Sequence, residues 1–329
     1  MKILITGAAG LLGTELTKQL LDAGHEVDAI DNFYTSSSDN IKQFKDNDNY
    51  TFVQHDIIYP LPNVFWNQRE WDQIYNLACP ASPIHYQRDP QYTLDCSLLG
   101  VRNMLALAEG IGAVFIQAST SETYGDPLEH PQMETYWGNV NTLGPRACYD
   151  EGKRAAETMC LLSSARCHIA RIFNTYGPNM ALNDGRAVSN FITQALADEP
   201  ITLHGTGKQT RSFCYVEDTV RGLILLANSD AQGPVNIGNP DEIELIELVN
   251  EILHITASKS EISWEPAAVD DPGQRCPDIS KAKTVLNWEP TVSRSAGLGR
   301  TVSGFIERIS KRNKVKYGAL PKVYYKTID

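Results

Sequence analysis

The sequence predicts an α/β protein, with a doubly wound parallel β-sheet followed by a smaller C-terminal α/β region. Through the first half of the chain, short apolar runs rich in β-formers alternate with stretches whose apolar residues recur at helical spacing. This alternation is typical of βαβ units, which build a parallel sheet with helices on both faces. The pattern breaks after Gly177-Pro178. We therefore predict a sheet domain over 1–178, a smaller domain over 179–312 that partly returns to the first, and a basic tail over 313–329.

Each expected element follows from its own residues. Strands are expected at the apolar runs Ile3–Ile5, Val27–Ile30, Thr51–Val53, Gln73–Leu77, Val114–Ala118 and His168–Phe173. Helical spacing between these runs predicts helices over Leu11–Leu21, Pro90–Glu109 and Arg146–Ser163. In the second half, the same criteria predict helices over Arg186–Ala197, Glu217–Asn228, Ile243–Ile255 and Leu298–Ile309, and extended pieces at Ile201–Leu203 and Val235–Ile237.

Composition narrows the class of protein. The chain has 329 residues, 42% of them hydrophobic and 21% charged, and a formal net charge of −11. Such an acidic chain is not expected to bind nucleic acid, and an anionic ligand would need a local cluster of Arg or Lys. The seven cysteines are odd in number and form no CxxC pair, so we expect neither a metal site nor a disulfide framework. With no secretory or membrane-spanning run in the sequence, we expect a cytoplasmic protein.

A glycine-rich turn follows the first expected strand. Thr6 to Gly13 reads TGAAGLLG, which has the GxxGxxG spacing and opens the first helix. Glycines allow a sharp turn and a close approach of the backbone to a diphosphate, which then meets free N–H groups at the positive end of the helix dipole. We therefore predict a Rossmann-type dinucleotide site, with the diphosphate held by Gly7, Gly10, Leu11, Leu12 and Gly13.

The second and third strands predict the adenosine side of this site. Asp31 ends the second strand, where a carboxylate accepts hydrogen bonds from ribose hydroxyls and repels a 2′-phosphate. NAD is therefore favoured over NADP as the cofactor. Asp56 and Ile57 follow the third strand and are expected to meet the adenine. The remaining residues expected to bind the cofactor are Asn32, Tyr34, Thr35, Leu77, Ala118, Tyr149 and Lys153.

Tyr149 and Lys153 form the expected catalytic pair. Tyr149 is the only one of fourteen tyrosines with a lysine four residues later, so both side chains leave the same face of a predicted helix. A free tyrosine has a pKa near 10, and a neighbouring ammonium and the positive nicotinamide ring both favour the phenolate. We expect Tyr149 to act as a general base, and Lys153 to lower its pKa and hold the nicotinamide ribose.

Three polar residues end another strand and are expected to face the substrate. Thr120, Ser121 and Glu122 follow the run Val114–Ala118. Ligands bind beyond the carboxyl ends of parallel strands, so a hydroxyl there could share a substrate proton with Tyr149. The alternative for Ser121 and Glu122 is a helix-capping role.

These residues resemble the extended short-chain dehydrogenase/reductase family. The resemblance rests on the glycine turn, Asp31, Thr120-Ser121-Glu122, Tyr149…Lys153 and Arg171–Pro178. Within the family, the chain is most similar to the branch that decarboxylates UDP-glucuronate, over 125–131, 136–138, 144–154, 183–186, 188–191, 209–211 and 277–279. The Thr-Ser-Glu triplet distinguishes this branch from similar 4,6-dehydratases, which have Thr-Asp-Glu and use the Asp to protonate a departing hydroxyl.

The resemblance implies decarboxylation of UDP-glucuronate to UDP-xylose through a 4-keto intermediate, without net oxidation. It implies that Arg275 acts with Glu122 at the sugar carboxylate, and that the protein is a homodimer formed by helices near 90–109 and 145–163. The residues expected to bind the UDP-sugar are Asn174, Arg186, Val188, His204, Gln209, Arg211, Tyr215 and Arg275.

The chain departs from the family pattern at three places. Ser97 stands where the family usually has Asn, His204 where an aromatic residue commonly stacks on uracil, and Thr35-Ser36 where Thr-Gly is common. Two other functions stay open. One is a 4,6-dehydratase or 4-epimerase that acts on a nucleotide sugar, and the other is an NAD-sensing regulatory protein, which would need the glycine turn but not the Tyr–Lys pair.

Overall fold

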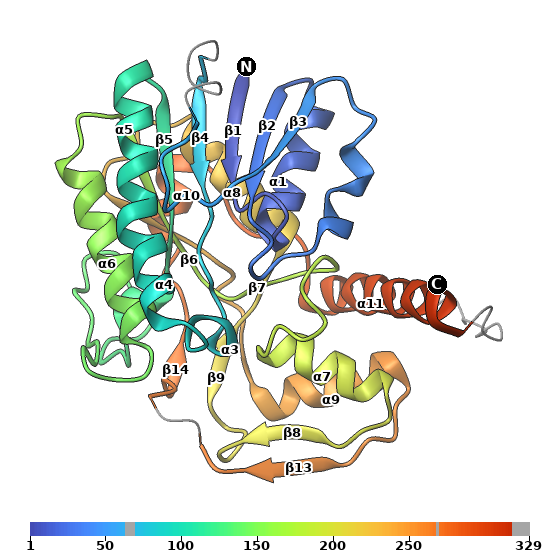
Figure 1. Cartoon of the computed structure of the whole chain (residues 1–329). Coiled ribbons are helices and arrows are strands. Elements are labelled where there is room, and N and C mark those ends of the chain that lie inside the picture. Colours follow the sequence, from blue (N-terminus) through green and yellow to red (C-terminus); the bar gives the residue numbers. More distant parts are fainter. Residues whose placement is uncertain (63–69, 268–269, 318–329) are drawn as a thin grey trace.

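A seven-stranded, all-parallel sheet forms the centre of the molecule (Figure 1). The computed structural model describes residues 1–62, 70–267 and 270–317, with side chains described up to residue 311. The strand order is β11-β6-β5-β4-β1-β2-β3. The strands are β1 (Lys2–Thr6), β2 (Glu26–Asp31), β3 (Tyr50–Gln54), β4 (Gln73–Asn76), β5 (Val114–Thr120), β6 (Cys167–Ile172) and β11 (Pro234–Ile237). The predicted doubly wound α/β fold is therefore confirmed.

Helices cover both faces of this sheet, as the βαβ pattern predicts. On one face lie α1 (Leu11–Asp22), α8 (Val216–Ala227) and α10 (Ser280–Leu286), and on the other lie α4 (Pro90–Asp95), α5 (Val101–Ile111) and α6 (Ala147–Leu162). Side chains along a strand point alternately to these two faces. In β1, Ile3 and Ile5 accordingly join one hydrophobic core and Leu4 joins the other.

The helix expected over 90–109 is interrupted. Cys96–Gly100 forms a π-helical turn between α4 and α5. Gly100 packs closely on the chain after β3, because a Cβ there would lie 2.6 Å from the Cδ1 atom of Ile57. Ser97, which is buried, lies on this turn. A local widening of this kind is typical of π-bulges within α-helices and is not visible in apolar spacing.

The second region carries short elements beyond the carboxyl ends of the sheet strands (Figure 1). Its helices are α7 (Ala187–Leu196), α9 (Leu245–Thr256) and α11 (Arg294–Tyr317). Strand β8 (Ile201–His204) pairs in parallel with β13 (Ile262–Glu265), and β9 (Thr210–Ser212) lies between β12 (Glu242–Glu244) and β14 (Gln274–Arg275). Other short elements near the carboxyl ends of the strands are α3 (Pro83–Tyr86), and β7 (Thr175–Tyr176), which pairs with β10 (Cys214–Tyr215).

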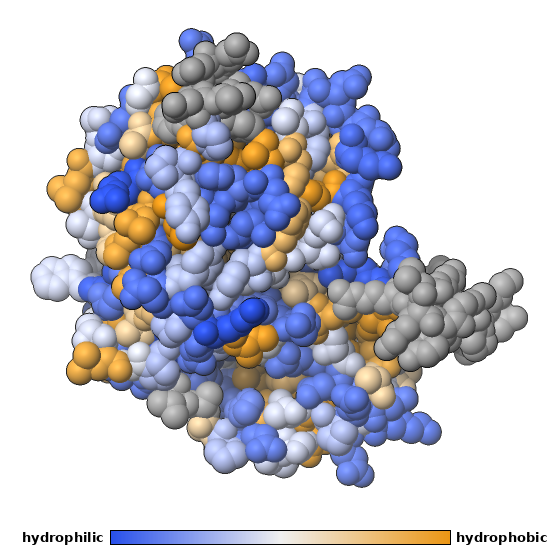
Figure 2. Space-filling model, in the orientation of Figure 1, coloured by the Kyte–Doolittle hydropathy of each residue, from blue (hydrophilic) through white to orange (hydrophobic). Residues whose placement is uncertain are grey.

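The last helix is longer than expected. α11 begins at Arg294 rather than Leu298 and continues to Tyr317, so the first residues of the predicted tail 313–329 are helical. The rest of that tail, 318–329, lies outside the described residues. Among the described residues, no helix is long and apolar enough to cross a membrane. On the face shown in Figure 2, polar residues predominate and hydrophobic ones occur in small groups.

One hydrophobic core joins the two regions. It runs from Ile3 and Ile5 in the sheet, through Val220 and Leu223 of α8, to Phe305 of α11. The strand β11 comes from the second half of the sequence but pairs with β6 in the large sheet. The second region is therefore packed against the first, with the carboxyl ends of the sheet strands between them.

Candidate active site

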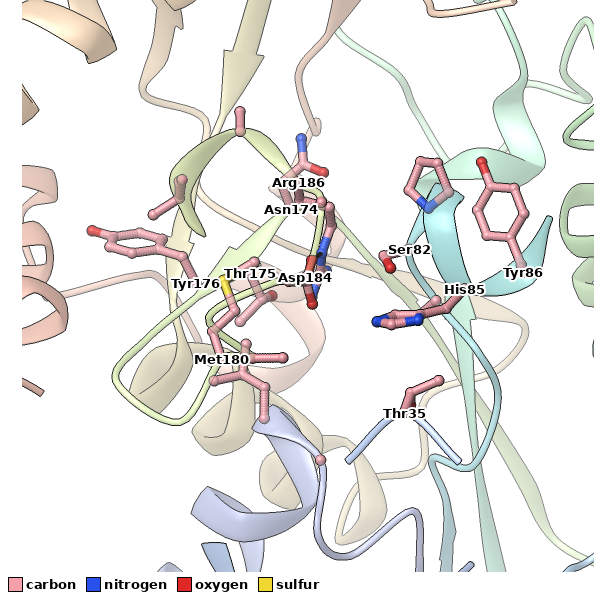
Figure 3. Close-up of a pocket in the computed structure, with 18 of the residues that line it drawn as sticks. Thr35, Ser82, His85, Tyr86, Asn174, Thr175, Tyr176, Met180, Asp184 and Arg186 are labelled. Atoms are coloured by element: carbon pink, nitrogen blue, oxygen red, sulfur yellow. Dashed lines mark hydrogen bonds and ion pairs between the residues drawn. The ribbon is translucent and has the colours of Figure 1, made fainter. Parts of the chain in front are cut away.

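A cavity of about 930 Å³ opens where the sheet strands end and the second region begins (Figure 3). Its walls include residues that follow β1, β4, β5 and β6, as expected for an open parallel sheet. The second region closes the other side with α7, β8 and β9. The following predicted site residues line this single cavity: Gly7, Gly10, Leu11, Leu12, Gly13, Thr35, Leu77, Ala118, Thr120, Ser121, Glu122, Tyr149, Lys153, Asn174, Arg186, Val188, His204, Gln209, Arg211 and Arg275.

The glycine turn has the geometry of a diphosphate cradle. A Cβ atom at Gly13 would lie 2.2 Å from the carbonyl oxygen of Gly7, and a Cβ at Gly7 would lie 2.8 Å from the backbone nitrogen of Ala78. Both positions therefore require glycine. Gly10 precedes α1, and no side chain among the described residues caps this helix. The first N–H groups of α1 are thus available to an anion at the positive end of the helix dipole, so these residues fit a dinucleotide.

Asp31 connects the glycine turn to the loop after β2. Its carboxylate accepts hydrogen bonds from the backbone N–H groups of Ala9 at 3.0 Å and Phe33 at 2.7 Å, and from the hydroxyl of Ser36 at 2.7 Å. Ser36 itself lines the cavity. Asp31 therefore lies behind the residues that line the cavity, and its hydrogen bonds hold those residues in place.

Other predicted adenosine contacts also lie behind the wall. Asp56 accepts hydrogen bonds from the Asn32 amide at 2.9 Å and the Tyr92 hydroxyl at 2.8 Å. The ring of Tyr34 packs on Tyr92 with centroids 4.6 Å apart. Within the described part of the chain, Asp31, Asn32, Tyr34, Asp56 and Ile57 are not among the residues that line the cavity. Their roles at the adenosine stay predictions.

Tyr149 and Lys153 lie on one face of α6 and border the cavity. The Lys153 ammonium donates a hydrogen bond to the carbonyl of Ala118 at 2.8 Å and lies 5.7 Å from the centre of the Tyr149 ring. The Tyr149 ring stacks on that of Tyr86, with centroids 5.2 Å apart and planes 6° from parallel. These contacts fix the phenol against the end of β5, next to Thr120.

The protein alone does not make the Tyr149 phenol acidic. Burial raises the pKa of Tyr149 above its ordinary value, although a hydrogen bond with Thr120 and the charge of Arg186 act in the opposite direction. This net shift comes mainly from burial, and the expected effect of the Lys153 ammonium on the phenol stays a prediction. In a low-dielectric site, a bound positive charge would have a large effect on the phenol, because little water screens it.

Glu122 is clamped between two arginines. Arg146 donates to one oxygen of its carboxylate and Arg275 to the other. Arg275, which is 3% exposed, also donates to the carbonyl of Gly125 at 3.1 Å. Burial alone would raise the pKa of Glu122, but the two guanidinium groups outweigh it and lower the pKa to about 2. Glu122 is therefore ionised at neutral pH.

Acidic residues extend this cluster. Asp271 bonds Arg211 at 2.8 Å and lies 3.5 Å from Arg146. Asp150 adjoins Tyr149 in the sequence and lies 4.0 Å from Arg146. Burial, followed by the charge of Glu122, raises the pKa of Asp150 to about 7. The arginine cluster that an anionic ligand would need is thus present, and carboxylates of the chain hold its arginines in place.

Several residues of the cavity were not predicted from the sequence. Arg146 is the most important of them, and its position three residues before Tyr149, on the same side of a helix, could have indicated it. Asp184 holds Arg186 through two hydrogen bonds of 2.5 and 2.9 Å. Figure 3 shows His85 and Ser82 opposite this pair. The His85 Nε2 and Ser82 Oγ atoms are buried without a hydrogen-bond partner among the described residues.

The structure does not bring Tyr215 to the cavity. Its side chain is buried against Tyr176, with ring centroids 5.7 Å apart, and the guanidinium of Arg300 lies over its ring. Tyr215 ends β10, whereas Phe213, which directly precedes that strand, lines the cavity. His204 does line the cavity, with its Nδ1 atom 3.0 Å from the carbonyl oxygen of Pro266.

The fold and the site are those of a Rossmann-type enzyme with a cradle for a dinucleotide. The chain belongs to the NAD dependent epimerase/dehydratase family, whose family model matches residues 3–238. Among curated relatives, the chain is similar to UDP-glucuronic acid decarboxylases. The chain is 48% identical over 320 residues to UDP-glucuronic acid decarboxylase 1 of Arabidopsis thaliana, covering 96% of this chain and 72% of that protein. It is 50% identical over 304 residues to UDP-glucuronic acid decarboxylase 6 of the same plant, covering 91% and 87%.

Solved structures agree with this assignment to the family. UDP-glucuronic acid 4-epimerase from Bacillus cereus, in complex with UDP-glucuronic acid and NAD, matches with a TM-score of 0.85 and 28% identity over 94% of this chain and 100% of that one. UDP-glucose 4-epimerase from Thermotoga maritima matches with a TM-score of 0.87 and 25% identity, over 94% and 100%.

Proposed function

We propose that this chain converts UDP-glucuronate to UDP-xylose by an NAD-dependent decarboxylation without net oxidation. The observation that carries the proposal is the meeting, in one cavity, of the glycine turn, the Tyr149–Lys153 pair and the ionised Glu122 between Arg146 and Arg275. The identities of 48% and 50% to curated UDP-glucuronic acid decarboxylases support the same function.

NAD is the proposed cofactor; the glycine turn would hold it, and it would supply reversible hydride transfer at C4 of the sugar. The chain contributes the proton chemistry at that carbon. We infer that Tyr149 takes the C4 hydroxyl proton, with Thr120 sharing it through the hydrogen bond that joins the two side chains. Lys153, anchored on the Ala118 carbonyl at 2.8 Å, orients the cofactor's ribose.

The arginine cluster accounts for the loss of carbon dioxide. A ketone at C4 is β to the C6 carboxylate, so the electrons released on decarboxylation enter a stabilised enolate. The enolate then takes a proton at C5, supplied overall by solvent, before the C4 ketone is reduced. A free cation at the carboxylate would stabilise the ground state more than a transition state that resembles neutral carbon dioxide. Because Glu122 neutralises Arg275 and Arg146, these arginines orient the carboxylate without binding it as firmly as free cations would.

The same cavity offers groups for the UDP part of the substrate. Arg211 is the proposed contact for the diphosphate, since a guanidinium recognises phosphate through paired hydrogen bonds. Its attachment to Asp271 at 2.8 Å fixes its direction. Gln209 and His204 lie on the cavity wall next to each other, with the Gln209 amide donating to the His204 carbonyl at 2.6 Å. We propose that they meet the base.

The alternative within the family is epimerisation or dehydration. The Bacillus cereus 4-epimerase was solved with UDP-glucuronic acid, so the same sugar can be oxidised at C4 on this fold and keep its carboxylate. Dehydration would need an acid to protonate a leaving hydroxyl, and the residue at that place is Ser121. The ionised Glu122 does not fill this role either, because its pKa is about 2.

Incubation of the purified protein with UDP-glucuronate and NAD tests the proposal. We expect release of carbon dioxide and formation of UDP-xylose without added NADH, identified by mass spectrometry and NMR. A product with unchanged mass would instead indicate the 4-epimerase. UDP-glucuronate recovered intact from a protein shown to hold NAD would refute both functions.

We also propose a homodimer. The helix α6, expected to form the contact between copies, exposes Leu161 and Leu162 with 81% and 80% of their surface accessible. Adjacent apolar side chains this exposed are often covered by a partner. Light scattering coupled to size-exclusion chromatography should give twice the chain mass.

A further inference from the structure

A cluster of three potential metal ligands lies outside the active-site cavity. The side chains of His130, Glu242 and Cys276 come from three separate segments of the chain, and one ligand atom from each lies within 4.8 Å of the other two. We propose that these residues bind a thiophilic divalent cation, with Zn²⁺ as the physiological choice.

The separation of the ligand atoms suits a small tetrahedral ion. The His130 Nε2 and Glu242 Oε2 atoms are 3.0 Å apart. Zinc bonds of about 2.0–2.3 Å place two tetrahedral ligand atoms roughly 3.3–3.7 Å apart. Small side-chain rotations therefore suffice to admit the ion. The combination of thiolate, imidazole and carboxylate selects Zn²⁺ or Co²⁺ over Mg²⁺ and Ca²⁺, which prefer oxygen ligands alone.

The backbone holds the three ligands before any ion binds. Glu242 begins β12 and Cys276 directly follows β14, and both strands pair with β9. Gln132 joins His130 to Cys276, because its N–H donates to the Cys276 carbonyl at 2.9 Å and its side chain accepts from the Cys276 N–H at 2.9 Å. The Thr210 hydroxyl donates to Glu242 Oε1, so the other carboxylate oxygen is directed at His130.

Negative charge around the cluster favours a cation. The carboxylates of Glu242, Asp278 and Asp241 all act on the Cys276 sulfur. Cysteine binds a metal ion as the thiolate, so its thiol must lose a proton. An incoming cation replaces that proton, which leaves to solvent as the metal–sulfur bond forms. His130 supplies its Nε2 lone pair, and water completes the tetrahedron.

The position of the site suggests what the ion would do. Cys276 follows Arg275, the guanidinium that holds Glu122 in the active-site cavity. Fixing Cys276 to two other segments would restrict the movement of Arg275. An effect of this restriction on turnover rests on the proposed function, whereas binding of the ion does not. The two ideas can therefore fail separately.

Cobalt is a direct probe, because Co²⁺ in a thiolate site has an intense near-ultraviolet charge-transfer band. Full-length protein, stripped with a chelator, is titrated with Co²⁺ and then with Zn²⁺. We expect the band to saturate at one Co²⁺ per chain, to disappear on displacement by Zn²⁺, and to accompany release of about one proton from the thiol. A wild-type protein without this band at stoichiometric Co²⁺ would overturn the proposal.

Variants identify the ligands. Cys276→Ser should abolish the band, and His130→Gln should weaken Co²⁺ binding by at least the roughly 10–100-fold that loss of a supporting partner causes at metal sites. Cys167→Ser, which removes a half-buried thiol at the start of β6, is the control and should keep the band. Should Cys276→Ser not fold, His130→Gln decides the question, because 37% of this side chain is exposed. A band unchanged in the His130 and Cys276 variants would refute the assignment.

Discussion

Replacing Glu122 by Gln tests the arginine clamp at the centre of the proposed mechanism. The substitution keeps the size of the side chain but removes the charge that pairs with Arg146 and Arg275. The shift in the pKa of Glu122 gives the expected loss of stability. The pKa of Glu122 is lowered from 4.5 to about 2, and each pKa unit corresponds to about 1.4 kcal/mol. The ionised carboxylate therefore contributes about 3 kcal/mol to the stability of the folded protein at pH 7.

The stability lost on this substitution should decrease as the pH falls. A carboxyl whose pKa is lower in the folded state stabilises the fold above its unfolded pKa of 4.5, and this contribution disappears as the pH falls towards the folded value of about 2. The difference in the free energy of unfolding between wild type and Glu122→Gln should be about 3 kcal/mol at pH 7 and about half of that at pH 3.

Urea unfolding followed by tryptophan fluorescence measures this difference. Glu129→Gln is the matched control, because this side chain lies on the surface, seven residues after Glu122 in the chain. We expect it to change the free energy of unfolding by less than about 0.5 kcal/mol. A Glu122→Gln protein as stable as wild type at pH 7, or a difference that does not narrow in acid, would show that the two arginines do not depend on this carboxylate.

Three further substitutions test the rest of the site. Tyr149→Phe should lower the rate of carbon dioxide release by about 10²–10⁴-fold, with the NAD content of the protein unchanged; a smaller effect would exclude the phenol as the base. Gly13→Ala should abolish NAD binding measured by calorimetry, because the new Cβ would lie 2.2 Å from a backbone oxygen of the turn, whereas Gly110→Ala, with nothing within 4 Å, should bind normally. Burial raises the pKa of Asp150 from 3.8 to about 7. Ionisation of Asp150 therefore lowers the stability of the folded protein as the pH rises above 3.8, and the full cost is reached above pH 7. The melting temperature of Asp150→Asn should therefore rise relative to that of wild type as the pH increases from 4 to 7. A difference in melting temperature that stays constant across this range would contradict the raised pKa.

Local patterns predicted most of the sheet and much of the cavity. The strands β1 to β6 each carry an apolar run that is visible without a structure. The glycine turn and the Tyr149–Lys153 pair are also local, because a turn needs particular residues at fixed spacing and a helix brings i and i+4 together. The strands β9, β12 and β14 were missed, since elements of two or three residues are too short to show an alternating pattern.

The sequence by itself determined which residues could carry the chemistry, because the order of strand, turn and helix decides which side chains reach the carboxyl edge of the sheet. Only the tertiary structure decided their electrostatics. Burial of Tyr149, the clamp on Glu122 and the high pKa of Asp150 arise from residues as distant along the chain as Arg275. Charges interact through space in a low-dielectric interior, so their effect depends on distances that no spacing along the chain reveals.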